Sequence, residues 1–251
     1  MNSMAISLIT FALVFGGALL GMFIRAVLPK DHLTAESKDA VKVGMGLVAT
    51  MAALVLGLLV ASAKAAYDAQ STEVTEMSAN IVVLDRILAH YGPETKEARD
   101  LLRGSVARVI DVMWPKGGTR PSDSAPRTAG GEILFDKIQG LVPKDDAQRA
   151  LQAQALSLAM SLAQTRWLMY EQGATSISMP LLIVLVFWLT ALFVSFGLFA
   201  PHNAIVVGSL FISALSVSGA IMLILEMYTP YSGLIQISNA PLRTALAHLG
   251  Q

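Results

Sequence analysis

Four stretches of the chain are apolar over about the length that a lipid bilayer requires. They are residues 4–27, 43–61, 180–199 and 203–225. A transmembrane helix needs about 20 predominantly apolar residues. Backbone polar groups inside hydrocarbon must be satisfied within their own segment, so each stretch is predicted to be a helix. Only residues 200–202 separate the last two stretches, which predicts a tight hairpin.

The second apolar stretch continues into a charged, amphipathic stretch, so residues 41–90 are predicted to form one long helix. No proline lies between Pro29 and Pro93, and no glycine lies between Gly57 and Gly92. The outer half carries an apolar seam in alternating steps of three and four residues, a spacing that requires a partner helix. The seam consists of Val74, Met77, Ile81, Leu84, Leu88 and Tyr91.

The region between the two pairs of apolar stretches is predicted to be helical and to lie in water. Amphipathic helices are expected at 94–114, 132–141 and about 144–171. Residues 115–131 are rich in proline, glycine and serine, which is typical of a flexible loop. The helix at 144–171 and the outer half of the long helix are expected to extend the third and second spans into the solvent.

The predicted fold is therefore an all-α membrane protein with four transmembrane helices. Its helical extramembrane domain is formed by extensions of the second and third spans. The predicted division is a transmembrane hairpin at 1–61, the extramembrane domain at 62–179, a second transmembrane hairpin at 180–227 and an interfacial tail at 228–251. The tail contains a turn at Pro230 and Gly233 and a short amphipathic helix at 241–249, so we expect it to be re-entrant or docked on a surface.

Composition supports a membrane protein and excludes several kinds of site. Only 14% of the 251 residues are charged, against about 25% in an ordinary soluble domain. The net charge of zero argues against nucleic-acid binding, which needs a basic patch. There is no cysteine, which removes thiol nucleophiles and zinc–cysteine sites. The four histidines (His32, His90, His202 and His248) do not pair at a ligand spacing, and no catalytic motif occurs. We expect no metal, no cofactor and no enzymatic activity.

Small residues recur along the second apolar stretch about every four positions. They are Gly46, Thr50, Ala53, Gly57 and Ala61. Such a stripe lets helices approach closely in lipid, and Gly17 and Gly21 repeat the spacing in the first stretch. Two interpretations stay open, and they are compatible. The stripe packs against other helices of the same chain, or it lines a pore in a ring of subunits with Thr50 facing water.

No ionisable residue lies near the middle of any predicted span, which argues against a proton or substrate relay. A passive pore remains possible, because a hydrophobic constriction gates by dewetting. At the mouth of the second span lie Lys64, Tyr67 and Asp68. They form either a solvated helix face with a snorkelling lysine and an interfacial tyrosine, or a vestibule that concentrates ions by its electric field.

Several separate pieces of the sequence resemble the bacterial bestrophin-like family. They are GLLVASAKAAYDAQ at 57–70, LDRILAHYGPET and EARDLLR within 84–103, QTRW at 164–167 and PYSGLIQISNAPL at 230–242. The resemblance implies four spans with a helical extramembrane region and a likeness to bestrophins, which are oligomeric anion channels. Bestrophins gate through aromatic constrictions on the second span. The second span here has no phenylalanine, so Met51, Leu54 or Leu58 would have to form the gate.

Two hypotheses about function follow. The first is an oligomeric, bestrophin-like ion channel, anion-conducting as the resemblance implies, with its pore lined by the second span. Its pore-lining candidates are Gly46, Thr50, Met51, Ala53, Leu54, Gly57, Leu58 and Ala61, and its vestibule candidates are Lys64, Tyr67 and Asp68. The second is a non-conducting membrane scaffold or sensor that acts through its helical extramembrane domain. The expected partners are lipid, ions and further copies of the chain, in a bacterial inner membrane.

The orientation in the membrane is not resolved by the residues alone. Basic residues near span ends mark the cytoplasmic side. They are slightly more numerous around the loop at 28–42 than around the extramembrane domain. The family resemblance implies the opposite, a cytoplasmic extramembrane domain, which is the orientation that we expect.

Overall fold

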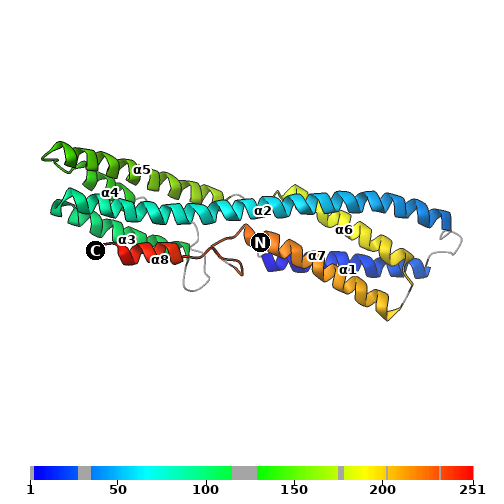
Figure 1. The fold of residues 1–251 in the computed structure, drawn as a ribbon. Helices are drawn as coiled ribbons and strands as arrows, with labels where there is room; N and C mark the ends of the chain where they lie inside the picture. Colours follow the sequence, from blue (N-terminus) through cyan, green and yellow to red (C-terminus); the bar gives the residue numbers. More distant parts are fainter. Residues whose placement is uncertain are drawn as a thin grey trace. The chain divides into compact units, whose positions relative to one another are not determined.

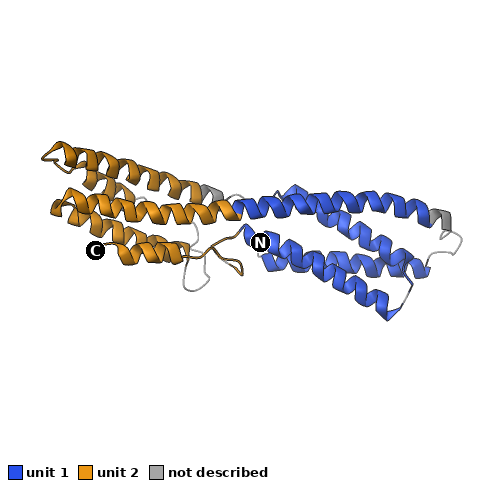
Figure 2. Ribbon diagram, in the orientation of Figure 1, with its two compact units in different colours: residues 1–66, 176–228 blue, residues 67–175, 229–251 orange. Residues whose placement is uncertain are grey.

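The computed structural model of the chain describes residues 3–27, 35–114, 129–174, 178–201, 203–231 and 233–250. Within these residues every regular element is a helix (Figure 1). The chain forms two compact units (Figure 2). The first unit is Met1–Ala66 with Ser176–Tyr228, and the second is Tyr67–Thr175 with Thr229–Gln251. The chain therefore passes from one unit to the other three times.

The longest helix, α2, spans Ala35–Tyr91 and contributes to both units. Its length follows from the absence of helix breakers along it. It ends where Gly92 adopts φ 138°, a conformation that favours glycine, immediately before Pro93. The predicted single helix over 41–90 is confirmed, although it begins earlier than expected.

The first unit contains the membrane-length helices. They are α1 (Ser3–Val27), the first part of α2, α6 (Met179–Phe199) and α7 (Ala204–Met227). Among the described residues, four helices are long and apolar enough to cross a membrane, and they coincide with the four predicted spans. The helix α1 contacts both α6 and α7. Completely buried side chains in the core of this unit are Val14, Ala18, Ala63, Leu185, Ala214 and Ile221.

Glycines bring α1 and α6 into close contact. A Cβ atom placed on Gly21 would overlap the carbonyl oxygen of Val194, and one placed on Gly197 would overlap the carbonyl oxygen of Ala18. At each of these two glycines the backbone of one helix therefore touches the backbone of the other, as small residues allow in lipid. At the end of this contact Arg25 donates to the carbonyl oxygen of Ala200, the C-cap residue of α6. The small-residue spacing in the first span thus serves packing within the chain.

The second unit consists of short and long helices around the outer part of α2. They are η2 (Pro93–Thr95), α3 (Lys96–Met113), α4 (Ala129–Gln139), α5 (Asp146–Ala174) and α8 (Ala240–His248). All six residues of the predicted seam on α2 are buried, from Val74 to Tyr91. They belong to one core with buried residues of α3, α4, α5 and α8. The prediction that the seam needs partner helices is confirmed.

Two predicted features of this region lie partly outside the described residues. Of the loop predicted at 115–131, residues 115–128 lie outside the described part of the chain, and α4 begins at Ala129. The extension of the third span appears as two elements, α5 up to Ala174 and α6 from Met179. Residues 175–177 between them also lie outside the described part.

The tail that follows α7 packs on the second unit. Ile237, Leu242 and Leu249 are each 3% exposed or less and join its core. The indole Nε1 of Trp114, at the end of α3, donates to the carbonyl oxygen of Ile237 over 2.8 Å. The ring of the same tryptophan meets Tyr231 edge to face, with centroids 5.3 Å apart. These three apolar residues of the tail are therefore covered by protein, and the surface on which they dock is the helical unit itself, whereas Leu234 stays 69% exposed.

Candidate functional site

One side of α2 is covered by no described part of the chain. The opposite side packs into the core of the first unit through Ala52, Leu59 and Ala63, with Met45, Val48, Ala49, Val55 and Leu56 half-buried beside them. All eight predicted pore-lining residues are exposed, and at 3.6 residues per turn they occupy adjoining positions. This surface, the open face of α2, consists of Gly46, Thr50, Met51, Ala53, Leu54, Gly57, Leu58 and Ala61.

The open face makes α2 the least covered of the four membrane-length helices. Only 11% of its most apolar window is buried, against 39% for α1 and for α6. A Cβ atom added to Gly46 or Gly57 would meet no atom within 4 Å. Packing within the chain, which explains Gly17 and Gly21, therefore does not explain the small residues of α2.

The chemistry of the open face is apolar with a single hydroxyl group. The side-chain oxygen of Thr50 donates to the carbonyl oxygen of Gly46 over 2.9 Å, so its proton is already used within the helix. Leu54 and Leu58 lie one turn apart and are 66% and 62% exposed. Together with Met51 they are the largest side chains of the open face. A path along this face would offer water-repelling side chains and no fixed charge.

The three vestibule candidates do not share one environment. Lys64 and Asp68 are exposed, whereas Tyr67 is half-buried and donates through its hydroxyl to the carbonyl oxygen of Gln236 over 3.3 Å. Lys64 and Asp68 each make a further polar interaction. Tyr67 therefore fastens the tail to α2, and the prediction of a vestibule keeps only Lys64 and Asp68 as exposed candidates.

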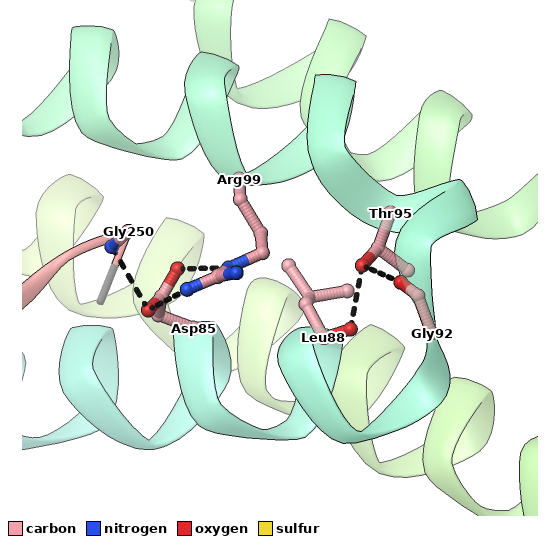
Figure 3. A network of polar contacts seen from close by, with 6 residues as sticks. All are labelled: Asp85, Leu88, Gly92, Thr95, Arg99 and Gly250. Atoms are coloured by element: carbon pink, nitrogen blue, oxygen red, sulfur yellow. Dashed lines mark hydrogen bonds and ion pairs between the residues drawn. The ribbon is translucent and has the colours of Figure 1, made fainter.

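A buried ion pair in the second unit was not singled out from the sequence (Figure 3). Arg99 of α3 donates from Nε and Nη2 to the two carboxylate oxygens of Asp85 on α2, over 2.8 Å and 2.9 Å. The backbone N–H of Gly250 reaches the same carboxylate over 3.3 Å. Nearby, the Thr95 hydroxyl bonds the carbonyl oxygens of Leu88 and Gly92, over 2.5 Å and 2.8 Å. These contacts join α2, the start of α3 and the tail.

The environment keeps Asp85 ionised. Burial alone would raise the pKa of this carboxyl group. The hydrogen bonds from Arg99 and from the Gly250 backbone, with the charges of Arg99 and Arg86, outweigh burial and hold the pKa below its ordinary value. A sequence signal existed, because Asp85 lies between seam residues Leu84 and Leu88 and so had to face or border the core.

A family model, the bestrophin-like domain, matches residues 11–242 of the chain. The chain belongs to the bestrophin-like family. Its fold is also similar to the crystal structure of a bacterial bestrophin homologue from Klebsiella pneumoniae that carries a mutation. The TM-score is 0.60 at 13% sequence identity, with 96% of each chain covered. No curated protein matches the chain.

The family predicted from the sequence pieces is thus confirmed, and at this low identity the solved structure supports the fold alone. As in the expectation from the sequence, the bestrophin-like chain is helical, with four helices of membrane length among its described residues. Within those residues, no group of three or more histidine, aspartate or glutamate side chains is arranged to hold a metal ion. The open face of α2 and the Asp85–Arg99 pair are therefore the two features from which function can be argued.

Replacing Asp85 with alanine should destabilise this bestrophin-like protein by about 2 kcal/mol, because Arg99 would keep a largely buried charge without its partner. The side chains are 2% and 20% exposed, and the partial exposure of Arg99 moderates the loss. Thermal unfolding of the full chain, followed by tryptophan fluorescence, measures the effect. Glu94→Ala is the control, because it breaks an exposed pair with Lys144 and should change little.

The same pair predicts a pH dependence. A carboxyl group whose pKa is lowered in the folded state stabilises that state fully above its unfolded pKa, and the contribution is lost as the pH falls through the folded pKa. The stability difference between wild type and Asp85→Ala should therefore be constant from neutral pH to about 5 and shrink below the ordinary value of 3.8. An undiminished difference at pH 3 would contradict this assignment.

Proposed function

We propose that this bestrophin-like protein is an oligomeric ion channel in which the open face of α2 lines the conduction path. The observation that carries the proposal is the exposure of all eight residues of that face in a helix long and apolar enough to span a membrane. Membership of the bestrophin-like family supports the same kind of function. The similar fold of a bacterial bestrophin homologue is consistent with the same kind of function.

The open face carries more small residues than the exposed face of α6, although α7 also exposes small residues such as Gly208 and Gly219. The exposed positions of α1 include Leu8, Leu13 and Phe23, and those of α6 include Ile183 and Phe187, all large and apolar. The open face instead alternates its leucines with glycine, alanine and threonine. Small residues leave less apolar surface for lipid, and in membrane proteins they gather where helices or water approach. A ring of copies closed by a heterologous interface would place this face around a common axis.

The proposed gate is the pair Leu54 and Leu58, with Met51 beside them. Two leucines one turn apart, repeated around an axis, form a constriction that excludes water and hence ions until it widens. No charge fixed in the membrane part of α2 selects cations over anions. We take anions as the conducted species on the basis of the family, with the second unit on the cytoplasmic side of a bacterial inner membrane.

The absence of cysteine from the chain makes a direct test simple. Single cysteines at Leu54 and Leu58 should react with a charged, water-soluble thiol reagent in vesicles, and the reaction should block chloride flux. A cysteine at Leu215, an equally apolar position of α7 that is 54% exposed, is the matched control and should react slowly without effect on flux.

Two results would overturn the proposal. The first is purified protein that carries neither anions nor cations at any salt concentration or pH. The second is equal reactivity of cysteines at Leu54 and Leu215, which would place the open face in lipid. An oligomer that conducts nothing would favour the alternative function, a scaffold or sensor acting through the second unit.

A further inference from the structure

The tail that follows α7 forms a closed turn soon after the last membrane-length helix (Figure 1). We call residues 230–237 the tail turn. The backbone N–H of Ile237 donates to the carbonyl oxygen of Pro230 over 2.8 Å. The side-chain amide of Gln236 donates to the carbonyl oxygen of Gly233 over 3.0 Å, and Gly233 adopts φ 101°, a conformation that favours glycine. The described part of the tail turn therefore has a defined shape.

The tail turn exposes the large apolar side chain of Leu234. This leucine directly follows Gly233 and is 69% exposed, whereas Ile237 is 3% exposed and belongs to the core of the second unit. Leu234 makes a further interaction within the protein. A leucine side chain has neither a polar atom nor a ring, so its backbone makes this interaction and the side chain stays exposed. The turn thus holds a leucine outward from a fixed backbone.

The tail turn lies close to the end of the apolar part of α2. Within the second unit, the Tyr67 hydroxyl donates to the carbonyl oxygen of Gln236 over 3.3 Å. The apolar stretch of α2 ends at Ala61, six residues before Tyr67, which is about 9 Å along the helix at its rise per residue. Side chains on an α-helix lean toward its N-terminus, which for α2 is the apolar end. Gln236 therefore lies about this far from the apolar end.

From this position Leu234 reaches the level of lipid headgroups. Leu234 precedes Gln236 by two residues, and an extended chain spans at most about 3.6 Å per residue, or about 7 Å here. The headgroup layer adds about 5–7 Å to each side of the hydrocarbon core. A separate contact marks the same boundary, because the hydroxyl groups of Tyr228 and Ser62 lie 3.2 Å apart. Ser62 directly follows the apolar stretch, and tyrosine is typical of membrane interfaces.

We propose that Leu234 inserts among the headgroups of the bilayer and so fastens the tail turn to a phospholipid surface. Entry into lipid removes the exposed leucine side chain from water, which is favourable. No charged residue lies in residues 230–237, so insertion desolvates no charge. The occupant is lipid because Leu234 follows Met227, the end of a membrane-length helix, by only seven residues. This inference rests on the membrane spans and does not depend on ion conduction.

The tail is then held at both ends. Leu234 is held by lipid, and near the other end the backbone N–H of Gly250 bonds the carboxylate of Asp85. Between them, Ile237 and Leu242 are buried in the core of the second unit. The same segment thus contacts the bilayer and the buried ion pair.

A single nitroxide label at Leu234 tests the contact with lipid. The chain has no cysteine, so Leu234→Cys and Val142→Cys each provide one labelling site. Val142 is the matched control, because it is also apolar, is 82% exposed and lies in the turn between α4 and α5. The first turn of α5 is bonded to Tyr91 at the far end of α2, about 45 Å beyond Ala61 along the helix.

Electron paramagnetic resonance in lipid nanodiscs, both faces of which are open to solution, measures collisions of each label with oxygen and with a water-soluble nickel complex. The discs contain phosphatidylcholine and phosphatidylglycerol. Oxygen favours apolar surroundings and the nickel complex favours water, so the oxygen-to-nickel ratio should be at least about threefold higher at 234 than at 142. Equal ratios at the two positions would place Leu234 in water and overturn the proposal. Few collisions with either reagent at 234 would place it against protein, as between two copies of the chain, and would also overturn it.

A second measurement avoids the label. In the same nanodiscs, the thiol of unlabelled Leu234→Cys should react with a charged, water-soluble reagent at least about tenfold more slowly than that of Thr244→Cys, because lipid covers it. Thr244 is an exposed position of α8 in the same tail, so the comparison holds the segment constant. Equal reaction rates would contradict insertion.

Discussion

Gly21→Ala should push α1 away from α6 and lower the stability of the protein by about 3 kcal/mol or more. Overpacking a core typically costs about 1–3 kcal/mol when side chains can move aside. Here the added methyl group would meet the backbone of Val194, including its carbonyl oxygen, and backbone cannot rotate away. Gly197→Ala should have a similar effect, because its methyl group would overlap the carbonyl oxygen of Ala18. Thermal unfolding of the purified protein in detergent measures both losses.

Gly16→Ala is the matched control for this prediction. Gly16 lies in the same helix, next to Gly17, and an added Cβ atom would meet nothing within 4 Å. Alanine is about 1 kcal/mol better than glycine inside a helix, so this change should be neutral or stabilising. If Gly16→Ala and Gly21→Ala proved equally harmful, the close contact of α1 with α6 would be wrong.

The long-range pattern of the fold could be predicted because it depends on periodicity. The seam from Val74 to Tyr91 repeats at helical spacing, and a helix with such a seam must bury it. The length of α2 followed from the positions of glycine and proline. Four apolar stretches of membrane length matched four helices because length and composition alone define them.

Which small-residue stripe serves packing could not be predicted. Gly17 with Gly21, and Gly46 with Gly57, are small-residue pairs in two predicted spans, yet within the described residues only the first pair contacts another helix. The difference depends on which helices are neighbours, and spacing along one helix does not contain that information. The same limit applied to the tail, since an apolar helix face such as that of Leu242 suits a protein surface as well as a lipid surface.

The ion pair was missed for a different reason. Charged residues on an amphipathic helix usually face water, so residue type alone does not predict a buried carboxylate at Asp85. Its partner Arg99 is 14 positions away on another helix, and the third contact comes from Gly250, 165 positions away. Only the folded chain brings these groups together, so a pairing pattern within one helix could not have revealed them.

The double substitution Leu54→Ser with Leu58→Ser should raise ion flux through reconstituted protein at least about tenfold. A dry constriction is a barrier because ions cannot shed water among leucines, and hydroxyl groups would let water remain. A tenfold increase requires the barrier to fall by only about 1.4 kcal/mol. The free energy of transferring one leucine side chain out of water, ~1.5–3 kcal/mol, is larger than this decrease in the barrier. Flux of chloride and of sodium, each paired with an impermeant counter-ion, measures both rate and selectivity.

Leu215→Ser is the control for the gate, because it changes an equally exposed leucine on α7, away from the open face. It should leave flux unchanged. If it opened the protein as much as the double substitution, a general loosening of the helices would explain both. If the double substitution reduced flux, the leucines would be packing residues at a subunit interface. A selective gain at Leu54 and Leu58 is the outcome that only a pore along the open face of α2 accounts for, because those leucines have no packing partner within the described chain to lose.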